Sequence, residues 1–187
     1  MLNIPLLNKN ILLVVTFVFI QLSSIAQSES PIKMHRIQDT TKDSSGLFYG
    51  KSTEGHFSVL LPIPFNDFTI EGEDAAMYII GSQGQDGIKF SVTEIVKKEK
   101  NKAIDLDALL KVFDSPENTI ENIRKEKIKD AQSISFSVFD KSKGAIIKHV
   151  DSKNSIFTMI IEFPIEQRKT VEREFGYFFS SLILWNQ

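Results

Sequence analysis

Apolar residues recur at every second position in several short runs of this chain, and this alternation is what most limits its fold. It is clearest at Phe57, Val59 and Leu61, and it returns along residues 88–96 and 156–163. Such alternation is typical of a β-strand with one buried face. Segments rich in Gly, Ser, Asn and Asp separate the runs, which favours tight hairpins. The sequence therefore predicts an antiparallel sheet.

Two segments instead place apolar residues at helical spacing. The first begins behind Asp105, a favourable N-cap, and restarts at Ser115 to run to about Arg124. The second covers Gln167 to Leu184 and carries a phenylalanine-rich stripe. The predicted strands are 46–51, 56–61, 77–80, 88–96, 128–139, 145–151 and 156–163. Together these elements predict an α+β fold, an antiparallel β-sheet with packed helices.

The chain also carries a loose motif, F-x-V-x-L-P at residues 57–62, and the run D-L-D-A-L-L at residues 105–110. With the order of predicted hairpins, meander and final helix, these features resemble the PsbP-like superfamily over residues 46–185. The resemblance implies an α/β/α sandwich and accessory or binding work rather than catalysis. It implies no particular metal or partner residues.

The N-terminal residues have the features of an export signal. Lys9 precedes an apolar run from Ile11 to Ile20, and small residues at Ser24 and Ala26 suit a peptidase cut. The predicted organisation is a signal peptide at 1–26, a flexible leader at 27–45 and a single domain at 46–187. The mature protein is then expected in the periplasm or outside the cell, with no membrane span after cleavage.

Composition excludes several classes of chemistry. The chain has no cysteine, which excludes disulfides, thiolate metal ligands and a cysteine nucleophile. Its formal net charge is −2, and basic and acidic residues are interspersed rather than grouped. This pattern argues against nucleic acid as a partner. We expect no cofactor.

His149 and Asp151 are the strongest candidates for acid–base or metal chemistry. They lie two residues apart on a predicted strand, so their side chains point to the same face. There they can pair with each other or offer two ligands to a metal ion. A zinc site normally needs about three or four protein ligands, and the sequence places no third one nearby. No metal site is therefore predicted.

Small hydroxyl side chains occupy the predicted non-core face of the sheet. This face is too polar for a second dry core and too apolar for an ordinary solvent surface. Its members are Ser58, Ser91, Thr93, Ser135, Ser137, Thr158, His149, Ile156 and Ile160. We interpret it, with Asp151, as a face for a ligand or partner, flanked by Phe65 and Phe68 on a predicted loop at 62–76. An ordinary wet sheet face, or one covered by the middle helices, is the alternative.

These observations favour an exported, non-catalytic binding or accessory domain. Its partner would be another envelope protein or a small apolar ligand. No serine stands beside a motif that supplies a base and an oxyanion hole, so acyl transfer is not predicted. Two alternatives stay open: a hydrolase or metal-dependent enzyme using His149 and Asp151, and a structural subunit of an envelope assembly.

Overall fold

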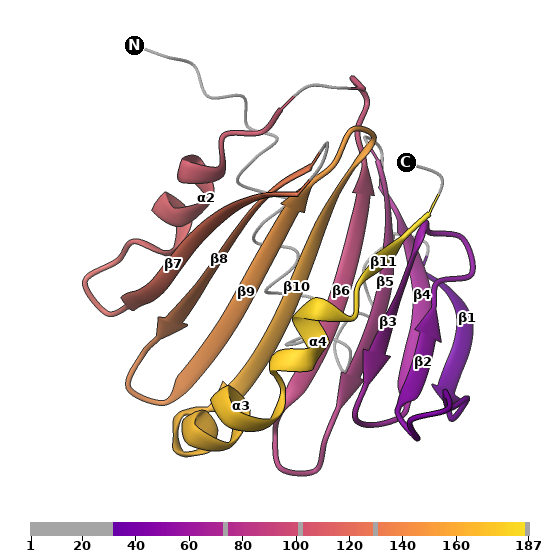
Figure 1. The fold of residues 1–187 in the computed structure, drawn as a ribbon, viewed down its shortest axis with the longest axis horizontal. Coiled ribbons are helices and arrows are strands. Elements are labelled where there is room, and N and C mark those ends of the chain that lie inside the picture. Colours follow the sequence, from indigo (N-terminus) through magenta and orange to yellow (C-terminus); the bar gives the residue numbers. More distant parts are fainter. Residues whose placement is uncertain (1–31, 73–74, 101–102, 129–130, 186–187) are drawn as a thin grey trace.

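Two antiparallel β-sheets form most of the computed structural model, which describes residues 32–72, 75–100, 103–128 and 131–185 (Figure 1). In order across the larger sheet, the eight strands are β1 (Ile32–Asp39), β4 (Phe65–Glu71), β5 (Ala76–Gln83), β6 (Lys89–Val96), β10 (Ser155–Pro164), β9 (Lys143–Asp151), β8 (Ala131–Phe139) and β7 (Thr119–Ile128). The smaller sheet has the order β11 (Ile183–Leu184), β3 (Phe57–Leu61) and β2 (Phe48–Lys51).

The fold is mainly β, with 54% strand and 16% helix. The predicted α+β class, an antiparallel sheet with packed helices, is therefore wrong. The α/β/α sandwich implied by the PsbP-like resemblance is wrong as well. Only short helices are present, because much of the sequence predicted as helix or loop pairs with neighbouring strands, where its backbone groups find partners along a sheet.

Several predicted strands are confirmed with small differences at their ends. They are 46–51, 56–61, 77–80, 88–96, 145–151 and 156–163, which correspond to β2, β3, β5, β6, β9 and β10. The hairpin between β8 and β9 turns at Asp140, whose carboxylate accepts bonds from the backbone N–H groups of Ser142 (2.6 Å) and Lys143 (2.7 Å). These backbone bonds hold the pKa of Asp140 below its usual value.

The main hydrophobic core lies between the two sheets. Phe57 of β3 and Phe157 of β10 are fully buried there, with ring centroids 6.0 Å apart in an edge-to-face arrangement. The short helices α3 (Arg168–Glu174) and α4 (Gly176–Ser180) cover the same face, after a 3₁₀ turn, η2 (Ile165–Gln167) (Figure 1). We call this side of the large sheet the α3–α4 face.

The opposite side of the large sheet, the α2 face, packs against α2 (Leu106–Phe113). The Asp105 carboxylate caps this helix by accepting bonds from the N–H groups of Asp107 (3.0 Å) and Ala108 (3.2 Å), so the predicted N-cap is confirmed. Leu106 packs with Ile134 of β8 on this face. The segment containing α2 joins β6, in the middle of the sheet, to β7 at its edge.

Residues 115–124 do not continue as a helix. From Thr119 they form β7, which pairs with β8, so the predicted strand 128–139 is the second half of a hairpin. β7 is an edge strand; most of its described side chains are exposed, and half of its residues are charged. Charged edge strands resist pairing with other chains. Because such a strand has little apolar alternation, the sequence does not predict it.

The C-terminal helix predicted at 167–184 is also interrupted. α3 ends at Phe175, whose φ of −109° and ψ of 13° leave helical geometry. The break lets Phe175 and Phe178 contact Phe90 edge to face, with centroids 5.1 and 5.4 Å away. After α4 the chain extends, and β11 pairs with β3 at Ser58. Packing and strand pairing thus outweigh the helical period.

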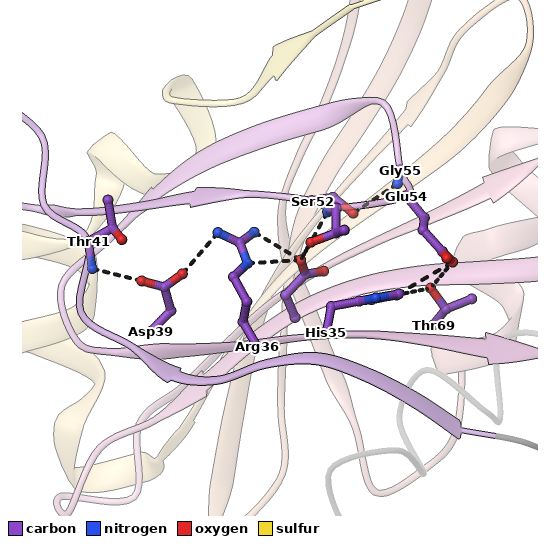
Figure 2. A network of polar contacts seen from close by, with 10 residues as sticks. His35, Arg36, Asp39, Thr41, Ser52, Glu54, Gly55 and Thr69 are labelled. Carbon is purple, nitrogen blue, oxygen red and sulfur yellow. Dashed lines mark hydrogen bonds and ion pairs between the residues drawn. The ribbon is translucent and has the colours of Figure 1, made fainter.

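Residues 32–39, which the sequence places in a flexible leader, form β1 and pair with β4. Polar contacts hold this strand (Figure 2). Arg36 donates two bonds to the buried Asp67 carboxylate, at 2.9 and 3.2 Å, and one to Asp39 at 2.9 Å. Asp67 also accepts bonds from the N–H (2.9 Å) and hydroxyl (2.6 Å) of Thr53.

The predicted signal peptide, residues 1–26, lies outside the described residues. Over the part of the chain that is described, no helix is long and apolar enough to cross a membrane.

Candidate functional site

The hydroxyl residues expected on one face of the sheet lie on both. Thr93, Thr158 and His149 are directly paired across β6, β10 and β9, and Ile134 pairs with His149 from β8. Directly paired residues share a face, so these four belong to the α2 face, together with Ser91 and Asp151. Ser135 and Ser137 alternate with Ile134 on β8 and therefore lie on the α3–α4 face. Ser58 lies in the smaller sheet.

His149 is a buried residue of the α2 face. Its Nδ1 atom lies 2.9 Å from the hydroxyl of Thr158, and its ring centroid lies 6.1 Å from that of Phe136. Burial lowers the pKa of His149 to about 4, so the imidazole is neutral at physiological pH. No described residue hydrogen-bonds to its Nε2 atom.

Asp151 lies on the same face but does not pair with His149. Its carboxylate forms an ion pair with Lys97 and accepts bonds from the Ile104 N–H and the Gln132 amide, both at 3.1 Å. These contacts hold the segment that leads into α2. Among the described residues no cluster of three or more His, Asp or Glu side chains is placed to hold a metal ion. Ser91 and Thr93, also on this face, are buried.

Phe65 and Phe68 are not on an exposed loop. Both are buried in β4: Phe65 belongs to the main core, and Phe68 packs with Ile79 on the α2 face. The prediction of a loop at 62–76 is wrong because Asp67 and Thr69 point inward and are buried, which hides the strand's apolar alternation.

A groove of about 420 Å³ opens on the α3–α4 face, beyond the edge of the main core. Its floor is β8 and β9, one wall is α3 and α4, and the other wall is β7. Its lining residues are Asn122, Arg124, Glu126, Ser135, Phe136, Ser137, Ile146, Lys148, Ile161, Val171, Glu172, Phe175, Gly176 and Phe179.

The floor of the groove is polar and has unused donors. Ser137 pairs with Ile146 across β8 and β9, and Ser135 pairs with Lys148. Lys148 is half-buried, and it has no hydrogen-bond or ion-pair partner within the described chain. The hydroxyls of Ser135 and Ser137 likewise bond to no described residue. Three donors thus face one concave surface without an acceptor among the described residues.

The helical wall of the groove is apolar. Phe175 and Phe179 are half-buried and one helical turn apart, with Val171 beneath them. Their positions are fixed from inside the core: Phe175 contacts Phe90, and Phe179 contacts Phe178 with centroids 5.2 Å apart. Packing within the protein therefore holds these wall side chains in place without a ligand.

A salt bridge beside the groove joins α3 to β7. Arg168 of α3 bonds to Glu121 of β7 at 2.7 Å and to Glu172 at 2.8 Å, and its guanidinium lies 3.9 Å from the ring centroid of Phe139. The hydrogen bond to Glu121 is the main cause that raises the pKa of Arg168. Arg168 partly neutralises Glu172, whereas the lining cations Lys148 and Arg124 form no ion pair with any described residue.

The sequence singled out Ser135 and Ser137 but missed the cations and the aromatic wall beside them. Lys148 precedes His149 on β9, so its side chain lies on the opposite face of the sheet. The sequence places Phe175 only in the apolar stripe of the predicted C-terminal helix, although it lines the groove. The alternation of serines with Ile134 and Phe136 on β8 was the available signal.

No protein-family model matches the chain, and a search of curated proteins finds no matching relative.

Proposed function

We propose that this chain is an exported, non-catalytic binding protein that holds a small ligand in the groove between α3–α4 and β7–β9. One observation carries the proposal: Lys148, Ser135 and Ser137 direct unused donors into a concave surface whose other wall is apolar. A few placed polar groups within an apolar pocket are typical of small-molecule sites. The groove volume, about 420 Å³, falls within the usual range for such ligands, about 300–1,000 Å³.

Export is supported by the composition of residues 1–26, and a ligand would then be met in the periplasm or outside the cell. Catalysis has less support. His149 and Asp151 are engaged by Thr158 and Lys97, and they lie on the face of the sheet opposite the groove. The described lining of the groove contains serines but no histidine to serve as their base.

Native mass spectrometry of the mature protein, purified from its own host, tests the proposal. We expect a polypeptide that begins at Gln27 and carries the added mass of a small molecule. Gly176→Trp should abolish this adduct, because Gly176 lines the groove and a Cβ there meets no other atom within 4 Å. Ser180→Trp, an exposed substitution on the same helix outside the groove lining, is the matched control.

Two results would overturn the proposal: a wild-type protein without any adduct, or an adduct that Gly176→Trp retains. A stoichiometric second protein in place of a small molecule would support the envelope-partner or structural-subunit alternatives instead.

A further inference from the structure

We propose that the ligand of the groove is a single-chain anionic amphiphile, with its anionic group at Lys148 and its apolar chain along Phe175 and Phe179. This inference rests on the proposed function and names the chemical class of the ligand. It follows from the donors, the charges and the apolar surface that meet in the groove.

Lys148 sets the sign of the ligand's charge. Its side chain rises from the middle of β9, where its paired neighbours on the same face are Ser135 and Met159, neither of them acidic. A half-buried ammonium has lost part of its hydration, which is costly unless an acceptor replaces the water. No carboxylate of the described chain forms an ion pair with it. A ligand oxygen that bears negative charge supplies the missing acceptor.

The other charged groups around the groove place a second cation beside Ser135. Arg124 lies on the β7 wall, directly paired with Ser135, so it faces the same headgroup position. Glu126 lies on the same wall, paired with Ser133, and Glu172 is held by Arg168 at 2.8 Å. The lining cations Lys148 and Arg124 therefore both lie beside Ser135 without an ion pair to a described residue, whereas the lining carboxylate of Glu172 is bonded to Arg168.

The hydroxyls of Ser135 and Ser137 add neutral donors beside the ammonium. Two hydroxyls and a lysine can together contact the several oxygens of a carboxylate or a phosphate group. A neutral alcohol offers one oxygen and satisfies only part of this set. The floor of the groove thus selects for an anionic headgroup rather than for a merely polar one.

The wall formed by Val171, Phe175 and Phe179 sets the nature of the rest of the ligand. These side chains and Ile146 line the groove with apolar surface that continues from the donors. A free inorganic anion would leave this surface wet, whereas an alkyl chain of the same ligand covers it. A groove of about 420 Å³ accepts one such molecule but not a folded partner.

Isothermal titration calorimetry with three dodecyl compounds tests the inference: laurate, dodecyl phosphate and the neutral dodecanol, each below its aggregation limit. We expect at least one anion to bind about tenfold or more tightly than dodecanol, since hydrogen bonds to charged groups are stronger than neutral ones. Tighter binding of laurate indicates a fatty-acid-like ligand, and tighter binding of dodecyl phosphate a lipid phosphate.

Lys148→Met should remove this preference, lowering the affinity for the anion about tenfold while leaving dodecanol binding unchanged. Lys111→Met is the matched control, because Lys111 is an exposed lysine on α2, which packs on the opposite face of the sheet. It should bind all three compounds as the wild type does.

Equal affinities for the anions and dodecanol, unaffected by Lys148→Met but lost in Gly176→Trp, would overturn the anionic ligand and leave the binding groove standing. Failure of the wild type to bind any of the three compounds would overturn this inference, and an empty protein in native mass spectrometry would separately overturn the proposed function.

Discussion

The polar contacts around β1 and the polar floor of the groove differ in how many bonding partners the described chain supplies. At β1, the buried carboxylate of Asp67 receives bonds from Arg36 and Thr53, and the His35 ring lies 2.9 Å from the Thr69 hydroxyl. In the groove, no described acceptor meets Lys148 or Ser135. In the first region the polar groups bond to one another and hold β1 in place. The second keeps them available, which is the property expected of a binding site.

The neighbouring residues Phe178 and Phe179 give the largest expected contrast. Phe178 is fully buried in the main core, whereas Phe179 is half-buried on the groove wall. Phe178→Ala should lower the free energy of unfolding by about 3–5 kcal/mol, and Phe179→Ala by about 1–2 kcal/mol. Urea unfolding followed by circular dichroism measures both. Similar losses for the two variants would contradict the distinction between core and groove wall.

His149 lies on the opposite face of the sheet. It should make the free energy of unfolding depend on pH. Burial lowers its pKa from 6.5 to about 4, so below pH 6.5 the unfolded chain binds a proton that the folded chain refuses. The free energy of unfolding should therefore fall as pH decreases from 6.5 to about 4, by on the order of 3 kcal/mol from this group.

His149→Gln lacks this titration. The difference in unfolding free energy between pH 7 and pH 4, measured in urea, should be smaller in the variant than in the wild type. An identical pH dependence of the two proteins would show that the imidazole is not held neutral by burial.

Arg36→Met tests the polar contacts that hold β1 against β4. It leaves the buried Asp67 carboxylate without its cation, so we expect a loss of about 2–3 kcal/mol in urea unfolding. The control is Arg173→Met, which removes an exposed ion pair to Glu174 and should change stability by less than about 0.5 kcal/mol. Equal effects of the two substitutions would mean that the network contributes no more than a surface pair.

Lys148→Met should have the smallest effect on the unliganded protein. Because Lys148 has no partner among the described side chains, its removal breaks no ion pair, and the free energy of unfolding should change by less than about 0.5 kcal/mol. A loss above about 2 kcal/mol in thermal or urea unfolding would show that the lysine supports the fold rather than a ligand.

Strands whose inward positions are mostly apolar were predictable from the sequence, whereas β4, with polar residues at two successive inward positions, was not. β10 carries Phe157, Met159, Ile161 and Phe163 on the main core face, and β6 carries Phe90 and Val92 there, followed by the buried Glu94. β4 was missed because Asp67 and Thr69 occupy inward positions, where Arg36 and His35 contact them from a strand more than thirty residues away. Such partners are visible only after β1 and β4 pair.

The groove was only partly predictable from the sequence, for a related reason. Alternation on β8 correctly separates Ser135 and Ser137 from Ile134, but the apolar side of β8 packs against α2, whereas that of β10 faces the smaller sheet. A single strand reveals its own two faces and not which layer covers each of them. The pairing of Ser135 with Lys148, and the approach of Phe175, depend on that layer arrangement.

Amide chemical-shift mapping by NMR during a titration with laurate is the most direct test of the groove as the ligand site. We predict shifts concentrated at Ser135, Ser137, Lys148 and Gly176, with little change at Thr93 and Thr158 on the α2 face. Shifts centred on α2 and the residues beneath it, or none at saturating laurate, would contradict the account.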